Sequence, residues 1–485
     1  MDKTIQQSLI HLFESVFNET VNTFELLPAS GSDRRYCRLI SSNHHIIGAY
    51  NSNFPENAAF VAFTKQFLSK GIAVPKIHAE DLSKGIYLLE DLGNETLFDF
   101  LNKERSSKEF PESVFLVYEK VVQDLATLQI KGHENMDYSV CYQSESFDKG
   151  AMVRDLNTFK YYFLQMVNAD FNRDRLDRDF NRFANYLLKE DSYTYFMFRD
   201  FQARNIMLKD DVPYYIDYQS GRKGALQYDL ASLLYQAKAA IPQDIREELT
   251  DTYINAVSKL IDIDAAKFRS YFYAYVMLRS MQVLGVYGLR GFFQKKEHFL
   301  TSIPYALTNI EWLLENNHFP KRMPELKAVL KQITKMESLR QLNDKYPNRP
   351  TNLTVTISSF SYKRAIPEDP SGNGGGFVFD CRNIHNPGRY QPYKKLTGRD
   401  KSVQDFLKTD SEIPDFLENV YSLVDRAVKK YIDRDFSHLM VSFGCTGGQH
   451  RSVFSADSLA AHLEQKFNVT IKVNHIEQEL KNWIN

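Results

Sequence analysis

The stretch FRDFQARNIML, from Phe198 to Leu208, decides the fold of the larger part of this chain. A short apolar run leads into it, and a second apolar run, YYIDYQ, follows it and places Asp217 at its end. Between the two strands that these runs predict, one loop carries Asp200 and, five positions further on, Asn205. One loop thus supplies a carboxylate and an amide, and a neighbouring strand supplies a second carboxylate.

This set of oxygen-bearing side chains is typical of phosphoryl transfer from ATP. The reaction needs a carboxylate that orients the attacking hydroxyl and accepts its proton, and it needs oxygen ligands for magnesium on the phosphates. Asp200 is therefore the predicted catalytic base, and Asn205 and Asp217 are the predicted Mg²⁺ ligands. Taken singly, an Asp after an apolar strand is often only a turn former. The order, the spacing and the strand flanks together favour a kinase site.

The pattern on either side of this loop predicts two domains. The chain has 485 residues, 43% of them hydrophobic and 25% charged, which is the composition of a globular protein too long for one core. Strands come first and helices dominate later, which predicts a bilobal α+β domain over residues 1–345. The polar stretch Gln341–Asn352 is the predicted boundary. Beyond it strands and helices alternate, which predicts an α/β layer domain over residues 352–485.

Charge, cysteine usage and hydropathy exclude several classes of protein. With 60 basic and 61 acidic side chains there is no general basic field, so we expect no nucleic-acid partner. The four cysteines are far apart and form no C-x-x-C pair, which argues against a zinc site or a disulfide framework and suits a reducing compartment. The N-terminus lacks the apolar core of a signal peptide, and no apolar run approaches the ~18 residues of a membrane span. We therefore expect a cytoplasmic protein without membrane contact.

A series of motifs makes residues 1–340 resemble a known family. The motifs are SGSDRRYCRL (Ser30–Leu39), GIAVPKIHAED (Gly71–Asp81), LLEDLG (Leu88–Gly93), FRDFQARNIML, IDYQ (Ile216–Gln219), YDLASLL (Tyr228–Leu234) and LRSMQVLGVYGL (Leu278–Leu289). In this order they resemble the aminoglycoside-phosphotransferase-like kinases, and among these the anomeric amino-sugar kinases that phosphorylate C1 of N-acetylmuramate and N-acetylglucosamine. The resemblance implies a protein-kinase-like fold, the cofactors ATP and Mg²⁺, an amino-sugar substrate and a role in the recycling of peptidoglycan sugars.

The resemblance also implies roles for residues outside the catalytic loop. The residues that it matches to nucleotide binding are Ser30, Gly31, Ser32, Arg34, Arg35, Glu90 and Leu92. The first five lie where a hairpin turn covers the ATP phosphates, and the last two lie at the hinge, where backbone groups meet adenine. Asp229 is the expected anchor of the catalytic loop. Arg279 is expected on a helix that faces the cleft, where it would contact the sugar or a phosphate; a salt-bridged helix arginine is the alternative.

Two departures separate this segment from protein kinases. Their catalytic loop begins His-Arg-Asp, and here Phe198 replaces the His. Their strand lysine pairs with the ATP phosphates, and here the matching strand, HIIGAYN (His45–Asn51), has no lysine. Arg34 or Arg35, in the adjacent hairpin, is the predicted source of the missing positive charge.

The second domain carries a predicted anion loop in FGCTGGQHRSV, from Phe443 to Val453. The loop follows an apolar strand and opens a helix, and its two glycines permit a tight turn and close approach of the backbone. Arg451 and the helix N-terminus both favour an anion. The spacing from Cys445 to Arg451 also matches the cysteine-dependent phosphatases, but chance matches to this spacing are frequent. Phosphate binding is favoured, and a phosphatase and a purely structural loop remain as alternatives.

Residues 353–485 also resemble a known domain. The matching pieces are ISSFSYKRAIPED (Ile357–Asp369), FVFDCRNIHNP (Phe377–Pro387), LTGRDKSV (Leu396–Val403) and GCTGGQHRSV (Gly444–Val453). They resemble the C-terminal domain of RapZ, an RNase adaptor that senses glucosamine-6-phosphate. The resemblance implies an amino-sugar phosphate ligand and self-association through this domain. The residues that it matches to the phosphate are Thr446, Gly447, Gly448, His450 and Arg451, with Asp380 and Arg382 facing the same pocket.

These observations lead to one preferred function and two alternatives. The preferred function is an ATP-dependent amino-sugar kinase with a C-terminal domain that senses an amino-sugar phosphate. The first alternative is a kinase of another small alcohol, such as an aminoglycoside or a choline-like compound. The second is a sugar-phosphate-sensing regulatory or RNA-adaptor-type binding protein with an inactive kinase domain. The joint presence of Asp200, Asn205 and Asp217 argues against the second alternative.

Overall fold

The structure is a computed structural model that describes residues 3–27, 34–105, 110–189, 194–342, 353–369, 376–433, 436–467 and 469–480. The chain divides into two compact units. The first unit consists of Met1–Leu289 and Ser302–Gln341, and the second of Arg290–Thr301 and Leu342–Asn485. Among the described residues, no helix has both the length and the apolar character that crossing a bilayer requires.

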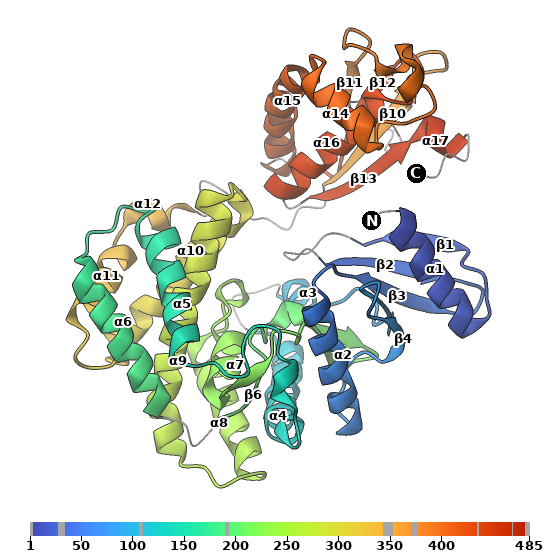
Figure 1. Ribbon diagram of the computed structural model, residues 1–485. Helices are drawn as coiled ribbons and strands as arrows, with labels where there is room; N and C mark the ends of the chain where they lie inside the picture. The colour runs from blue at the N-terminus through green and yellow to red at the C-terminus, as the bar shows by residue number, and fades with distance from the viewer. Residues whose placement is uncertain are drawn as a thin grey trace. The chain divides into compact units, whose positions relative to one another are not determined.

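The first unit begins with an antiparallel sheet in the strand order β1-β2-β3-β5-β4. Its strands are β1 (Thr23–Leu26), β2 (Arg35–Ile40), β3 (His45–Tyr50), β4 (Ile77–Asp81) and β5 (Ile86–Glu90). Helix α1 (Lys3–Phe17) packs on this sheet through Leu9 and Phe13 (Figure 1). Helix α2 (Phe54–Ser69) follows β3 and starts at Asn53, whose side chain accepts the N–H of Glu56.

Helices form most of the rest of the first unit. They are α3 (Leu97–Glu104), α4 (Glu112–His133), α5 (Lys149–Phe159), α6 (Arg173–Leu187), α7 (Leu226–Leu234), α8 (Gln243–Ser258), α9 (Ala265–Tyr287), α10 (Ile303–Glu315), α11 (Pro324–Thr334) and α12 (Glu337–Arg340). The long helix α9 is buried along much of its length. It packs so closely on α5 that a Cβ added at Gly285 would lie only 2.7 Å from the backbone nitrogen of Phe159. A sheet lobe followed by a helical lobe is the predicted bilobal, protein-kinase-like α+β fold.

Two small antiparallel sheets lie within the helical lobe. They pair β6 (Thr194–Met197) with β9 (Arg222–Ala225) and β7 (Ile206–Lys209) with β8 (Val212–Tyr215). The sequence predicted one strand–turn–strand unit here and did not predict β9, whose polar, Gly-containing residues give no strand pattern. The connection from β6 to β7 carries the catalytic loop, and the connection from β8 to β9 carries Asp217.

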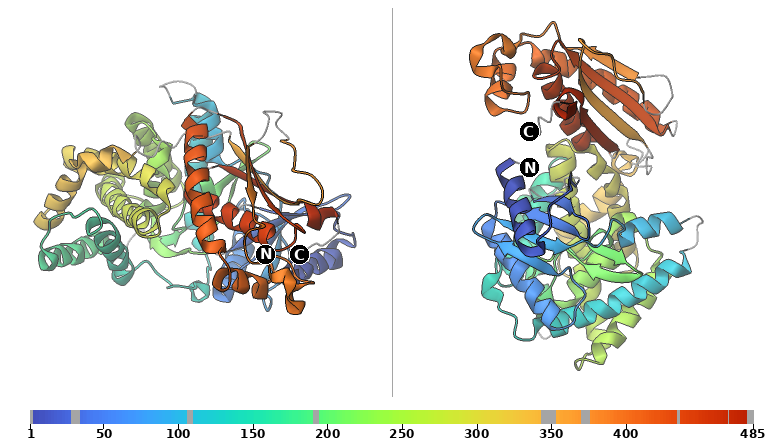
Figure 2. Two further views of the ribbon diagram at one scale, coloured as in Figure 1. Left: turned by 90° about the horizontal axis from the view of Figure 1, so that it is seen from above. Right: turned by 90° about the vertical axis from the view of Figure 1, so that its right-hand side faces the viewer.

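The second unit is built on a parallel sheet in the strand order β11-β12-β10-β13. Its elements are β10 (Thr354–Ser361), β11 (Gly376–Asp380), β12 (His438–Cys445), β13 (Thr470–His475), α14 (Lys401–Thr409), α15 (Ile413–Asp433), α16 (Arg451–Lys466) and α17 (Ile476–Leu480). The strands run side by side in the right-hand view of Figure 2. Seven consecutive residues of each of the central strands β10 and β12 are buried, as expected for parallel strands covered on both faces. This is the predicted α/β layer domain.

Candidate functional site

The structure brings the three predicted kinase residues together at the base of the β7–β8 hairpin. The side-chain nitrogen of Asn205 donates a hydrogen bond to the backbone carbonyl of Asp200 at 2.9 Å. The same nitrogen lies 3.4 Å from Oδ2 of Asp217. Because the amide nitrogen is engaged by the loop, the amide oxygen is the group of Asn205 that can serve as a metal ligand.

The backbone of this site is strained at two positions. Arg199 has a φ of 84° and Asp217 a φ of 70°, a left-handed conformation that non-glycine residues rarely adopt. Such strain persists only where the surroundings enforce it, and it gathers at functional sites. Here the guanidinium of Arg199 is held by both carboxylate oxygens of Asp155, at 2.8 and 2.7 Å. The fold therefore fixes the direction in which Asp200, the next residue, is presented.

Asp229 anchors the catalytic loop through its backbone N–H groups. Its carboxylate accepts the backbone N–H groups of Phe198 at 2.6 Å and Arg199 at 2.9 Å, and the side-chain N–H of Gln129 at 3.1 Å. Burial raises the pKa of this fully buried carboxyl to about 7. Phe198, which stands where protein kinases have His, is buried edge-on against the ring of Tyr218. The loop is thus held by Asp229 and by aromatic packing, without the His.

Asp200 is paired with Arg279 of α9. Nη2 of Arg279 lies 3.1 Å from Oδ1 of Asp200, and the side chain of Arg279 is 5% exposed while that of Asp200 is 42% exposed. Burial acts to raise the pKa of Asp200, but the positive charges of Arg279, Arg199 and Arg204 outweigh it and hold this pKa below its ordinary value. In this structure Arg279 thus forms the salt bridge that was the alternative expectation, with the catalytic carboxylate as its partner, and a contact with the sugar or a phosphate stays a prediction.

The pKa of the second carboxyl, Asp217, is shifted in the opposite direction, above its ordinary value. Its burial, together with the negative charge of Asp200, raises its pKa, although Gln219 donates a hydrogen bond to it at 2.7 Å. A half-buried carboxylate on which the negative charge of a second carboxylate acts favours a bound cation. The oxygen ligands of Asp217 and Asn205 fit Mg²⁺, which prefers carboxylate and carbonyl oxygen. The described ranges contain no group of three or more His, Cys, Asp or Glu side chains that could hold a metal ion.

The residues predicted to bind the nucleotide lie in three environments. Ser30, Gly31 and Ser32 fall outside the described residues. Arg34 is buried and Arg35 is exposed. Glu90 ends β5, and its carboxylate is paired with Lys209 of β7 at 2.7 Å. Leu92 follows it and is buried. The link between the sheet and the helical lobe thus carries its own ion pair, which no sequence pattern had indicated.

The glycine loop of the second unit makes the predicted tight turn. Gly448 has a φ of 62°, and a Cβ there would lie 2.4 Å from Cγ of Glu477. Gly447 has open space around its missing side chain, and Thr446 is exposed. The hydroxyl of Ser361, at the end of β10, donates to the carbonyl of Thr446 at 2.8 Å. The loop lies at the carboxyl ends of the parallel strands, where open α/β sheets bind ligands.

Two residues predicted to hold a phosphate are used differently in this structure. Nη1 of Arg451 donates to the carbonyls of Arg382 at 3.0 Å and Ile384 at 2.7 Å. Nε2 of His450 donates to the carbonyl of Tyr393 at 2.9 Å, and burial lowers the pKa of this imidazole, which keeps it neutral near pH 7. Both side chains thus donate to backbone carbonyls in this structure, through one nitrogen each, and their contact with a phosphate stays a prediction.

The structure also bears on the phosphatase alternative. The thiol of Cys445 is buried and lies 3.2 Å from the hydroxyl of Ser452. Burial acts to raise its pKa, while the bonds from Ser452 and the charge of Arg451 lower it, and the lowering prevails. The thiol is thus little exposed, one nitrogen of Arg451 is bound to two carbonyls, and the phosphatase stays an alternative prediction. Asp380 and Arg382, expected at the same pocket, pair with each other at 2.7 Å.

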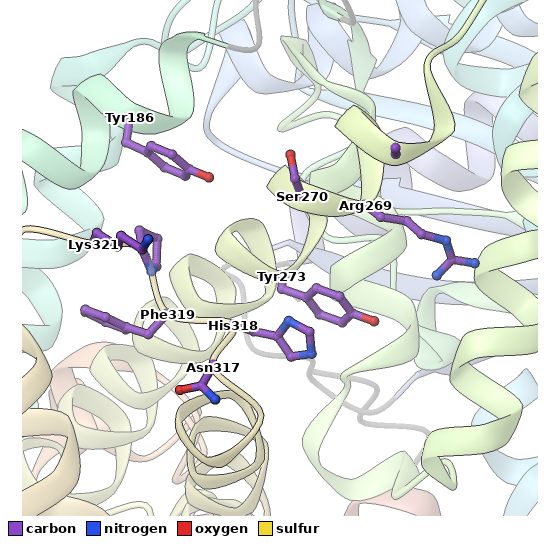
Figure 3. A pocket seen from close by; sticks show the side chains of 10 residues that line it. Tyr186, Arg269, Ser270, Tyr273, Asn317, His318, Phe319 and Lys321 are labelled. Carbon is purple, nitrogen blue, oxygen red and sulfur yellow. The ribbon is translucent and has the colours of Figure 1, made fainter.

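A separate pocket of about 600 Å³ lies in the helical lobe, between α6, α9 and the segment that links α10 to α11 (Figure 3). Its walls include Tyr186, Tyr273 and His318, and the rings of the last two stack with centroids 3.8 Å apart. Arg269, at its edge, is bound to Glu247 at 3.0 Å. No residue predicted for catalysis or nucleotide binding lines it.

Comparison with known proteins agrees with the fold of each unit. Residues 48–269 match the Phosphotransferase enzyme family (APH), and residues 353–479 match the RapZ C-terminal domain. The chain thus contains an APH-type domain with a protein-kinase-like fold, followed by a RapZ C-terminal domain with a parallel sheet.

Individual relatives cover parts of the chain. A nucleotide-binding protein of Dinoroseobacter shibae is 42% identical over 127 residues, which are 26% of this chain and only 40% of that protein's length. Among solved structures, choline kinase from Cryptosporidium parvum has a TM-score of 0.46 and 12% identity, and covers 67% of this chain and 99% of its own. A putative aminoglycoside phosphotransferase from Ralstonia eutropha has a TM-score of 0.41 and 11% identity, and covers 71% of this chain and 98% of its own.

Proposed function

We propose that the first unit transfers the γ-phosphoryl group of ATP to a hydroxyl of an amino sugar, at the anomeric position of N-acetylmuramate or N-acetylglucosamine. The observation that carries the proposal is the joint placement of Asp200, Asn205 and Asp217, with Asn205 bonded to the loop and 3.4 Å from Asp217. The match of residues 48–269 to the phosphotransferase family supports it.

Each residue of the site has a defined task in this reaction. Asp200 orients the acceptor hydroxyl and accepts its proton, and the strained, anchored backbone at Arg199 sets the direction of its carboxylate. Asn205 and Asp217 would hold Mg²⁺, which would neutralise charge on the phosphates. Because Arg279 holds the pKa of Asp200 low, Asp200 contributes chiefly by orientation and remains ionised at neutral pH.

The surroundings of Asp200 favour a sugar over a cationic acceptor. An ammonium group of choline or an aminoglycoside would have to compete with Arg279, which already occupies the carboxylate at 3.1 Å. The charges of Arg199 and Arg204 act in the same direction. An anomeric hydroxyl is the most acidic hydroxyl of a sugar, so it makes the smallest demand on a base whose pKa is low. A neutral or anionic acceptor with an anomeric hydroxyl therefore suits this site best.

For the second unit, we propose that it binds an amino-sugar phosphate and senses it. Exposed Thr446, the open space at Gly447 and the N-terminus of α16 offer backbone N–H groups to a phosphate. Arg382, which is half exposed, lies over the ring of Tyr362 at 3.9 Å and supplies a positive charge at the same strand ends. A cytoplasmic location and self-association through this unit belong to the proposal, and both rest on the family resemblance.

The test is a phosphorylation screen with the full chain and Mg²⁺-ATP. The acceptors are N-acetylmuramate, N-acetylglucosamine, glucosamine, an aminoglycoside and choline, each with and without glucosamine-6-phosphate. We expect transfer to the N-acetyl sugars, with the product phosphorylated at C1, and a change in rate or binding with the added sugar phosphate. Transfer only to choline or the aminoglycoside would contradict the proposed substrate, and indifference to glucosamine-6-phosphate in both readouts would contradict the sensor.

A further inference from the structure

Arg34, the residue directly before β2, is a buried arginine. We propose that Arg34, held in place by Glu56, is the cation that binds the ATP phosphates, in the role that a strand lysine and a helix glutamate share in protein kinases. The inference rests on the proposed kinase function and deepens it, since it assigns the missing phosphate-binding charge and names its positioning residue.

The contacts of Arg34 show a side chain held in one place. Its Nη2 lies 2.8 Å from Oε1 of Glu56, which lies in the first turn of α2, and its side chain is 1% exposed. Its guanidinium lies over the ring of Phe60, 5.6 Å from the centroid. The other oxygen of Glu56 accepts from Asn51, after β3, at 3.1 Å. Glu56 therefore connects Arg34 both to α2 and to the segment that follows the lysine-free strand.

Arg34 also lies close to the metal carboxylate. The ring of Phe60 stacks on that of Tyr218 at 5.0 Å, and Tyr218 directly follows Asp217. A phosphate chain bound to Mg²⁺ at Asp217 would thus extend within reach of the guanidinium.

The chemistry of Arg34 suits a phosphate. Among the described residues its Nε is buried and has no hydrogen-bond partner, so the guanidinium retains a donor for a ligand. Arginine presents donors in a planar fork that fits phosphate oxygens, and it remains charged when buried. Glu56 neutralises part of the charge in the free protein and sets the direction of the fork. Arg35, the other candidate in this hairpin, is exposed at the start of β2, which leaves Arg34 as the phosphate cation.

The experiment measures binding of Mg²⁺-ATP and of adenosine to the full chain by calorimetry, with steady-state kinetics alongside. For R34A we expect affinity for Mg²⁺-ATP about 10- to 100-fold lower, with affinity for adenosine unchanged. R34K should recover part of the loss. E56Q should lower kcat more than it raises the KM for ATP, because Glu56 positions Arg34 without touching the nucleotide. The matched control K65A, which removes an exposed cation of α2, should bind as the wild type does.

Two further outcomes separate the possible failures. Because R34A leaves Glu56 buried without its partner, the double variant R34M/E56M, which replaces the pair with apolar groups, tests the same point in a folded protein. It should melt near the wild type and still bind Mg²⁺-ATP weakly. Wild-type affinity in a folded R34A or R34M/E56M would overturn this inference alone. Failure of the wild type itself to bind Mg²⁺-ATP would overturn the proposed function and this inference with it.

Discussion

Replacing Arg279 with Gln should change the pH dependence of the reaction in a defined direction. The ion pair with Asp200 spans 3.1 Å, and its positive charge helps to hold the pKa of that carboxyl below its ordinary value. Loss of the charge lets this pKa rise. Asp200 must be ionised to accept a proton, so the acid limb of kcat/KM should move to higher pH in R279Q.

The size of the shift follows from the exposure of the pair. Two unit charges about 4 Å apart interact by roughly 4 kcal/mol at a protein surface and by roughly 1 kcal/mol in water. Since 42% of the Asp200 side chain is exposed, the interaction lies between these limits. At about 1.4 kcal/mol for each pKa unit, the acid limb should move up by about one to two pH units. Lost orientation of the carboxylate should also lower kcat about 10- to 100-fold at pH 8.

The assay is initial-rate phosphoryl transfer at saturating Mg²⁺-ATP and low acceptor concentration from pH 3 to 9, a range that includes the low acid limb of the wild type, with thermal unfolding recorded at each pH. The matched control is R178Q, which removes an exposed arginine of α6 and should leave the acid limb in place. If R279Q lost activity by the same factor at every pH and kept the acid limb of the wild type, the reasoning would be refuted. Arg279 would then support the fold without acting on the charge of Asp200.

Three further predictions concern stability. Burial raises the pKa of Asp229 to about 7, from an ordinary value of about 3.9. The free energy of unfolding of the wild type should therefore fall as the pH rises from about 4 to about 7. In D229N the free energy of unfolding should not depend on pH in this way, and urea unfolding at pH 5 and pH 8 measures the difference. R451A leaves two backbone carbonyls without a donor and should destabilise the second unit by about 2–3 kcal/mol in thermal unfolding. G448A should cost about 1–2 kcal/mol because of its positive φ and the contact with Glu477, whereas G447A, with open space around it, should be nearly neutral.

The sequence predicted the kinase site where the chemistry is local. Asp200 and Asn205 lie on one loop, and Asp217 follows on the next hairpin, so spacing and strand flanks were sufficient to place them together. The partners of this loop were harder to predict. Asp155 and Glu56 come from helices distant in the sequence, and neither lies in a motif. Only the packing of those helices brings their charges to the site.

The second unit shows the same limit at the level of a single loop. The glycines of the anion loop predicted its tight turn, since a positive φ at Gly448 depends on the residue itself. The directions of His450 and Arg451 could not be predicted in this way. Each turns toward carbonyls of a distant segment, and the positions of those carbonyls depend on the whole sheet. Residue type indicated an anion site, while tertiary hydrogen bonding set the direction of each side chain.

Phosphoryl transfer by the Asp200 variant D200N tests the central claim most directly. The measurement is formation of sugar 1-phosphate from Mg²⁺-ATP and N-acetylmuramate, followed by phosphorus NMR, in the wild type, in D200N and in the control D211N, which alters an exposed carboxylate of the β7–β8 turn. We predict product with the wild type and D211N, and a rate at least about 100-fold lower with folded D200N. Undiminished transfer by D200N would contradict the account.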